Sequence, residues 1–306
     1  MENKREFVNL KVKKVFLIHY IPLTESGESL DLHMGWNDPS ELIQQYMDSI
    51  YESSRHTYKY EIVKQENFSE MTELIGNFVY PLNMLKAVVD GKEEPRSPMH
   101  IDYGELMRRF EIPLGIASRV YDEVWLMGYP YAGFYEAVMG GPNALWLTGP
   151  AIPDTNNSLR RFVVMGFDYS KDLGGMLEAF IHRAEAIMFN EYDGYPSAKN
   201  MWKRFTAIDK TSPQNAGIGT AHYAPNSLSD YDWNNSRYVM SNCDDWNTYP
   251  NLKGKVTTVN ATEWGNGSRI KHHEWWLKHL PHGVGKTDGV FNNWFHYIMT
   301  PDWCRR

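Results

Sequence analysis

Strand and helix patterns alternate along the first 190 residues, and this alternation constrains the fold more than any other feature of the sequence. Four segments read as short strands, at residues 14–20, 58–64, 123–127 and 161–167. Helical patterns cover residues 38–53, 82–89, 103–110 and 172–190. Strands separated by helices pair in parallel through right-handed crossovers, with helices on both faces. The sequence therefore predicts an α/β fold with a Rossmann-like, mostly parallel sheet over residues 1–190.

The start of the first long helix is marked by a local signal. Asp38 can accept hydrogen bonds from the first turn, Pro39 suits the first helical position, and Glu41 stands where a capping box requires an acidic residue. We therefore expect this helix to begin at Asp38 and to continue to about Ser53.

Regular patterns end near Glu191. Beyond it Gly, Pro, Asn and Asp recur every few residues, and many of the 11 tryptophans and 19 tyrosines of the chain lie in this part. No flexible composition marks a hinge near residue 190. We expect residues 191–306 to form a loop-rich, aromatic extension that packs directly on residues 1–190, so that the two make one compact unit.

Charge and hydropathy exclude two classes of partner. The net charge of −7 argues against a general nucleic-acid binder, because phosphate contacts require clustered Lys and Arg. No apolar run approaches the roughly 20 residues that span a bilayer. Residues 15–21 are too short for a secretory leader, so we expect a cytoplasmic protein, or a secreted one whose leader has been removed. Cys243 and Cys304 leave open whether one disulfide forms.

The helix expected at residues 172–190 carries a polar stripe. Glu178, His182 and Glu185 are spaced by four and three residues, so they share the face opposite the apolar one. Carboxylates and an imidazole on one helix face suit a divalent metal. A solvated helix face has the same pattern, and the spacing alone does not separate the two interpretations.

Histidines gather near the carboxyl end of the chain. Five of the 11 lie between His272 and His296, and several share a segment with Trp275 and Trp276. In a helix His272 and His279 share one face, and two imidazoles there, joined by His182 or a carboxylate, would give three ligands and an open position for water, as in catalytic zinc sites. The segment lacks the His-Glu-x-x-His signature. The alternative is that these histidines are surface residues or hydrogen-bonded members of the core.

A third polar cluster begins at His222 and continues through Asp230, Tyr231 and Asp232. Alternating oxygen donors suggest the opening of a calcium loop. However, Asn235 stands where an EF-hand requires glycine, and Ser241 where it requires glutamate. An EF-hand is therefore excluded. An irregular cation site and a run of Asx turns both remain open.

In open parallel sheets, ligands bind beyond the carboxyl ends of the strands. Here the third expected strand is followed by Gly128 to Gly133, and Glu136 lies just beyond, where it could act as an acid or a ligand. The chain has no Gly-x-Ser-x-Gly elbow and no phosphate-binding Gly-Lys-Ser/Thr loop. These absences remove the usual support for a serine hydrolase or a nucleotide-binding protein.

Three groups of residues together carry a family resemblance. They are Asp122-Glu123-Val124-Trp125 with Gly133-Phe134-Tyr135-Glu136, then His182-Arg183-Ala184-Glu185, then His222-Tyr223-Ala224-Pro225-Asn226 with Asp230-Tyr231-Asp232. This set resembles a family of uncharacterised, mostly secreted bacterial and fungal proteins, and the likeness covers roughly residues 12–300. The resemblance implies that these polar positions form one site, and it implies no reaction. This chain departs from the family in lacking an obvious leader.

The leading hypothesis is a metal-dependent enzyme, in the first place a hydrolase of a small-molecule, peptide or glycan substrate, with zinc as the expected metal. A metal-bound water would be the nucleophile. The expected ligands are His182, Glu185, His222, His273 and His279. Glu178 or Glu136 would be the general base. The residues expected to orient ligands or line the pocket are Asp230, Asp232, Tyr231, Trp275 and Trp276.

Two other functions are consistent with the same residues. The first is a non-catalytic module that binds glycans through exposed Trp and Tyr side chains. The second is a structural protein whose histidines serve packing alone. An enzyme requires His182, His222 and one of the late histidines to lie within ligand reach, whereas a binding module does not.

Overall fold

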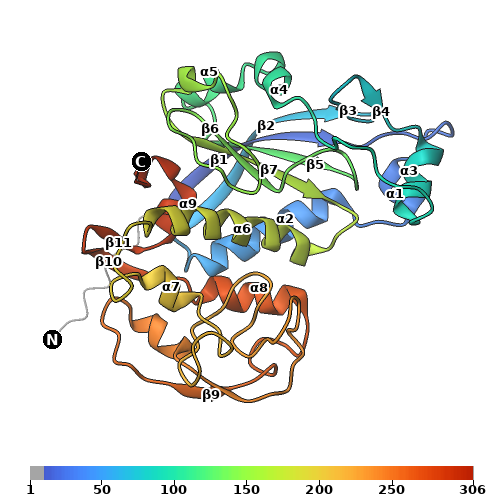
Figure 1. The fold of residues 1–306 in the computed structure, drawn as a ribbon. Helices are drawn as coiled ribbons and strands as arrows, with labels where there is room; N and C mark the ends of the chain where they lie inside the picture. The colour runs from blue at the N-terminus through green and yellow to red at the C-terminus, as the bar shows by residue number, and fades with distance from the viewer. Residues whose placement is uncertain (1–9, 306) are drawn as a thin grey trace.

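A five-stranded, mostly parallel sheet forms the centre of the molecule in the computed structural model, which describes residues 10–305 (Figure 1). The strand order is β2-β1-β5-β7-β6. Neighbouring pairs among the first four strands are parallel, and β6 pairs antiparallel to β7. The strands span β1 Lys11–Tyr20, β2 Tyr58–Phe68, β5 Glu123–Gly128, β6 Ala137–Gly140 and β7 Phe162–Asp168. The prediction of an α/β fold with a mostly parallel sheet is confirmed.

Helices lie on both sides of this sheet (Figure 1). One side carries α2 (Pro39–Ser53) and α6 (Leu173–Glu191), and the other carries α4 (Tyr103–Arg109) and α5 (Ile112–Ala117). Near the carboxyl ends of the parallel strands lie α1 (Leu30–Met34), β3 (Glu73–Leu74), β4 (Phe78–Val79) and α3 (Leu82–Val89). All six residues of β5 are buried, as expected of a central parallel strand covered on both faces.

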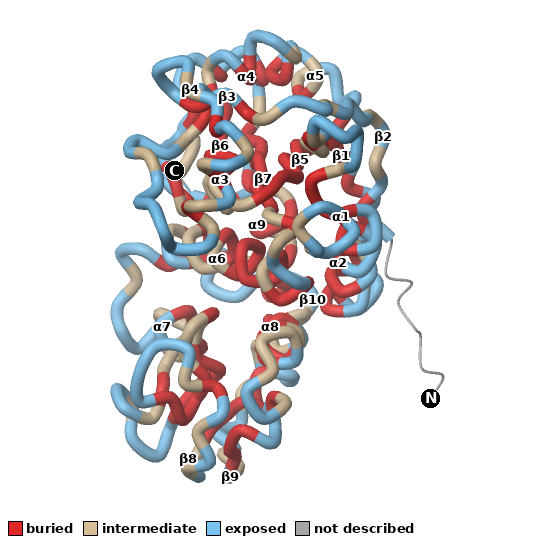
Figure 2. Tube along the Cα trace, turned by 90° about the vertical axis from the view of Figure 1, so that its right-hand side faces the viewer, coloured by how far each residue is buried: buried red, intermediate tan, exposed pale blue. Residues whose placement is uncertain are grey.

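The polypeptide beyond α6 forms a second layer on the side of α6 that faces away from the sheet (Figure 1). It contains α7 (Met201–Phe205), β8 (Val239–Ser241), the 3₁₀ helix η2 (Cys243–Thr248), β9 (Thr257–Val259) and α8 (Arg269–Lys278). We call residues 192–268 with α8 the loop-rich lobe. Its centre is aromatic, because Phe205 contacts Trp246, Trp276 and Trp294 with ring centroids between 5.2 and 5.4 Å apart. Figure 2 shows this buried centre beneath exposed loops.

The last elements return to the sheet layer. They are β10 (His282–Thr287), β11 (Val290–Asn293), α9 (Phe295–Met299) and the 3₁₀ helix η3 (Pro301–Trp303); a further 3₁₀ helix, η1, spans Asn156–Ser158. The Tyr58 hydroxyl lies 2.7 Å from His296 Nδ1, and the Arg161 guanidinium donates to the carbonyl oxygen of Pro301. The chain therefore closes on its own first half. Within residues 10–305, no helix combines the length and apolarity needed to cross a bilayer.

Candidate metal centre and the adjoining cavity

Helix α6 separates the sheet from the loop-rich lobe, and its two faces carry different chemistry. Toward the sheet, Arg183 forms an ion pair with Glu123 of β5, and the two side chains are 0% and 2% exposed. Toward the lobe, the helix presents Glu178, His182 and Glu185. The polar stripe is therefore covered by the second half of the chain, and it does not form a solvated helix face.

Three metal-ligand atoms converge between α6 and the lobe. Glu178 Oε1, His182 Nε2 and His222 Nε2 all lie within 4.8 Å of one another. His222 Nε2 is 3.1 Å from His182 Nε2 and 3.1 Å from Glu178 Oε1. His182 and His222 are two of the predicted ligands. Glu178, which we expected to be a base, takes the ligand position that we had assigned to Glu185.

A carboxylate stands behind each of the two imidazoles. His182 Nδ1 lies 2.6 Å from Glu136 Oε2, and His222 Nδ1 lies 3.3 Å from Asp230 Oδ1. Since an ionised carboxylate only accepts, Nδ1 of His182 carries a proton that it donates to Glu136, and a neutral His182 ring then has its lone pair at Nε2. Carboxylates placed in this way behind histidines are typical of metal centres, where they fix the tautomer and the ring orientation.

The convergence therefore brings together two imidazole Nε2 atoms and a Glu178 carboxylate oxygen, which are atoms that bind divalent metals. The fourth group at the site is Tyr231, whose hydroxyl lies 2.9 Å from His222 Nε2 and 3.1 Å from Glu178 Oε1. One hydroxyl proton can satisfy only one of these acceptors. A proton on His222 Nε2 would satisfy one more of them, whereas a divalent metal would bind all three ligand atoms at once.

The segment that presents His222 is fixed by side chains of the two helices beside it. Glu185 of α6 accepts from the Ala221 amide at 2.8 Å. His273 Nε2 of α8 lies 3.2 Å from the Ala221 carbonyl oxygen, and Trp276 Nε1 donates to the Gly219 carbonyl oxygen at 3.0 Å. The side chains of Glu185 and His273 therefore position the backbone next to His222, and neither belongs to the ligand group.

Tyr231 closes the same segment in a strained conformation. Its φ is 56°, in the left-handed region that non-glycine residues rarely adopt, and its amide donates to the His222 carbonyl oxygen at 3.0 Å. Strain of this kind is concentrated at functional sites, where the surroundings hold it in place. The turn places the Tyr231 hydroxyl directly at the ligand atoms.

The charges around the site shift several pKa values. Burial acts to lower the pKa of His182, but the hydrogen bond to Glu136 and its negative charge outweigh burial, and the pKa is raised. Burial acts to raise the pKa of Glu136, yet the partnership with His182 lowers it overall. Burial raises the pKa of Glu185. The Glu136–His182 pair is therefore strongly polar and lies in a partly buried setting.

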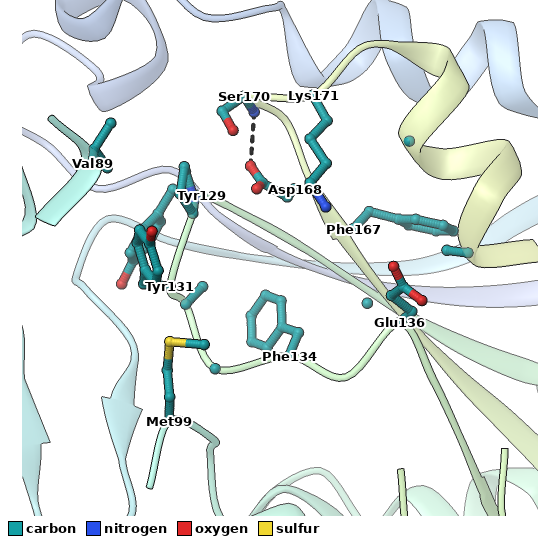
Figure 3. Close-up of a pocket in the computed structure, with 16 residues that line it drawn as sticks. Val89, Met99, Tyr129, Tyr131, Phe134, Glu136, Phe167, Asp168, Ser170 and Lys171 are labelled. Carbon is teal, nitrogen blue, oxygen red and sulfur yellow. Dashed lines mark hydrogen bonds between the residues drawn. The ribbon is translucent and has the colours of Figure 1, made fainter. Parts of the chain in front are cut away.

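A cavity of about 480 Å³ opens at the carboxyl ends of β5 and β7 (Figure 3). Its walls include Tyr129, Phe134 and Phe167, with Gly175 and Ala179 of α6. Glu136 lines the cavity and also contacts His182, so this carboxylate connects the cavity to the histidine pair. Figure 3 shows Asp168 and Lys171, which also line the cavity, on the loop that enters α6. The cavity therefore presents a cation and two carboxylates beside its aromatic walls.

Gly133 allows this wall of the cavity to close. Its φ is +84°, and a Cβ atom there would collide with Leu74 and with the backbone of Ile101. Only glycine fits both requirements. The Gly128–Gly133 segment noted in the sequence therefore serves as a tight wall of this cavity.

Several predicted site residues lie elsewhere. His279 belongs to a second group with Cys243 and Asp244. Trp275 and Trp276 are buried, at 9% and 0% exposure, and they pack against Trp264 and Phe205. They lie in the aromatic core because the apolar face of α8 turns toward the lobe. Asp232 accepts from the Leu228 amide at 3.0 Å and from Asn235, which makes it a turn residue.

Arg269 is a site residue that the sequence did not reveal. Its guanidinium is 3.6 Å from Glu178 Oε2 and forms a 2.6 Å ion pair with Asp172. It thereby orients the second oxygen of Glu178. An arginine in the first turn of a helix is common, and only the packing of α8 against α6 brings it to this position.

Comparisons with known proteins identify no family or relative for this chain. No family model matches the chain, and neither a curated protein nor a solved structure does so. The function of the chain is therefore inferred from its described residues alone.

Proposed function

We propose that the chain is a metal-dependent enzyme, in the first place a hydrolase, and that Glu178, His182 and His222 bind its catalytic divalent metal. The observation that carries the proposal is the convergence of ligand atoms from Glu178, His182 and His222, with the Glu136 carboxylate hydrogen-bonded behind His182. Two imidazoles and one carboxylate form a donor set that catalytic zinc uses.

Two of the three separations between ligand atoms agree with such a centre. Ligand atoms about 2.0–2.1 Å from a tetrahedral metal lie roughly 3.3 Å from one another. The two shortest separations here, His222 Nε2 to His182 Nε2 and to Glu178 Oε1, are both 3.1 Å. The competing explanation is a proton, held as an imidazolium on one of the two rings. A metal and a proton are therefore the two alternatives that an experiment has to separate.

The residues around the ligands fit a hydrolytic reaction. Three protein ligands leave one position for water, and a bound divalent metal lowers the pKa of that water toward neutrality. The Tyr231 hydroxyl lies at the ligand atoms, where it can donate to charge that develops on a substrate oxygen. Glu136 keeps His182 in place and faces the cavity, so we retain it as the candidate general base.

The cavity at the strand ends is the proposed substrate site. In open parallel sheets, ligands bind outside the carboxyl ends of the strands, and this cavity opens at the carboxyl ends of β5 and β7. The strand order reverses one position away, between β1 and β5. A volume of about 480 Å³ fits a small molecule, or the end residue of a peptide or glycan.

A glycan-binding module is less well supported. It requires a set of Trp and Tyr rings on the surface; Trp146, Tyr238 and Trp303 are exposed, but Trp275 and Trp276 are buried. His182 and His222 also converge, which that function does not require.

Elemental analysis of the purified protein tests the proposal. We expect zinc, iron or manganese in the wild type, and we expect His182→Ala and His222→Ala each to contain one equivalent less. His56→Ala is the matched control, because His56 is an exposed histidine that pairs directly with Glu52. Wild-type metal content that His182→Ala leaves unchanged, or no uptake after incubation with divalent cations, would favour the shared proton and contradict the proposal.

The second measurement is of hydrolytic activity. A panel of ester, phosphoester, peptide and glycoside substrates is incubated with the wild type, and the positive reactions are repeated with Glu178→Gln. Loss of a hydrolytic rate on removal of the metal, with recovery on its return, supports a hydrolase. A protein that binds metal at this site and hydrolyses none of these classes would retain the metal centre and lose the hydrolase assignment.

A further inference from the structure

A second group of metal-ligand atoms lies in the loop-rich lobe, away from the cavity. Cys243 and Asp244 begin η2 directly after β8, and His279 follows the last residue of α8. Their ligand atoms all lie within 4.8 Å of one another. A thiol, an imidazole and a carboxylate are the three donor types that proteins use for zinc.

His279 is held as metal-binding histidines usually are. Its Nδ1 lies 2.7 Å from the carbonyl oxygen of Trp275, which fixes the proton on Nδ1 and leaves a lone pair at Nε2. The ring also packs on the Trp275 side chain, with centroids 4.4 Å apart. A backbone carbonyl behind the ring is one of the outer partners that orient ligating histidines.

Cys243 is equally fixed and is inaccessible. Its side chain is 1% exposed, and its amide donates to Ser241 Oγ at 3.1 Å. A thiol this deeply buried cannot attack a substrate from solvent, so a nucleophilic cysteine paired with His279 is excluded. Cys243 and Cys304 are both free in this structure, so no disulfide joins them.

We propose that Cys243, Asp244 and His279 bind a second divalent metal, zinc by its donor set, that serves structure. The exposed Asp244 faces solvent, where its second oxygen or a water completes four-coordination. This site is independent of the proposed catalytic centre, since the two share no ligand.

A metal at this position would stabilise the irregular structure of the lobe. The lobe contains little regular structure, and its two strands have three residues each. A metal between η2 and the end of α8 would tie these loops to the helix that packs on α6. Metal that binds only the folded chain adds its binding free energy to the stability of the fold.

Cobalt(II) distinguishes this site from the catalytic one, because only this site offers a thiolate. The full chain is stripped of metal with a chelator, titrated with cobalt(II), and followed for a thiolate-to-cobalt charge-transfer band in the near ultraviolet. We expect the band in the wild type, in Cys304→Ser and in His182→Ala. We expect its loss in Cys243→Ser and roughly a tenfold or greater weakening of cobalt binding in His279→Gln.

Asp244→Asn provides a variant that should fold normally, because the side chain is exposed. We expect it to retain the band with weaker cobalt binding. A wild type without the band, or a band that survives in Cys243→Ser, would overturn the second site. Either result would leave the His182-dependent metal untouched, so the two proposals fail separately.

Discussion

The two halves of the chain solve the problem of burying polar groups in different ways. Residues 10–191 form regular strands and helices, and their deepest polar contact is the ion pair between Glu123 and Arg183. Residues 192–305 bury neutral imidazoles and aromatic rings, and burial lowers the pKa of His282 to about 3 and that of His296 to about 4. The first half therefore buries a matched pair of charges, and the second buries several neutral imidazoles; His19 of the first half is also a buried imidazole, and burial lowers its pKa to about 4.

This difference explains where the candidate metal centre lies. A repeating strand and helix pattern leaves few places for an unsatisfied polar group, whereas irregular loops can place an imidazole at an arbitrary point. His182 comes from the regular half and His222 from the irregular one. The centre forms at the surface of α6 where the two halves meet, and each half supplies a ligand.

The largest expected effect comes from breaking the buried ion pair. Arg183→Met leaves Glu123 charged and buried without its partner, and it also removes the hydrogen bonds from Arg183 to the Ile298 carbonyl oxygen in the second half. We expect a loss of about 3–5 kcal/mol in the free energy of unfolding. Urea denaturation of the wild type and the variant measures this loss.

Arg108→Met is the matched control, because Arg108 pairs with Glu105 on the exposed surface. We expect a change of about 1 kcal/mol or less for that variant. If Arg183→Met were no more harmful than Arg108→Met, the first half would not depend on its matched charges.

The next effect concerns the neutral histidines of the second half. His282 stacks on Phe295 with centroids 5.2 Å apart, and burial lowers its pKa from 6.5 to about 3. Below pH 6.5, His282 therefore binds a proton in the unfolded chain but stays neutral in the folded chain. This contribution to stability is complete above pH 6.5 and is lost progressively as the pH falls toward about 3.

At pH 5 the loss from this one group is about 2 kcal/mol relative to pH 7. His282→Phe keeps the stacking and removes the titration, so its stability should fall by about 2 kcal/mol less than that of the wild type over the same range. Urea titrations at both pH values test this, with the exposed His56→Phe as control. Equal acid sensitivity in His282→Phe and the wild type would mean that His282 is protonated in the folded state.

The smallest effect comes from a purely local signal in the first half. The Asp38 carboxylate accepts from the amides of Ser40 and Glu41 at 2.7 and 3.4 Å, which caps α2. Asp38→Ala should cost about 1 kcal/mol. Asp38→Asn, which keeps an accepting oxygen, should cost clearly less. Equal losses would indicate that the negative charge at the helix end contributes more than the cap hydrogen bonds.

The longer helices and strands of the first half were accessible from the sequence, because each depends on a local pattern, whereas the short elements α1, α5, β3 and β4 were not predicted. The Asp38 cap and the strand at residues 123–127 lie where the patterns predict them. The short strand β6 was missed: its four residues are all buried and include Gly140, so no alternation marks them. The segments of the second half carry no period, and their positions depend on contacts between distant residues.

The sequence by itself determined the sheet layer and the polar stripe of α6, because both follow from periods of two and of 3.6 residues along one segment. It also offered His182 and His222 as candidates without joining them. Only the tertiary structure decided that Glu178 joins the histidines, while Glu185 fixes the Ala221 amide. The physical reason is that both glutamates share one helix face, and which of them meets His222 depends on where a loop 40 residues away along the chain from His182 packs against that face.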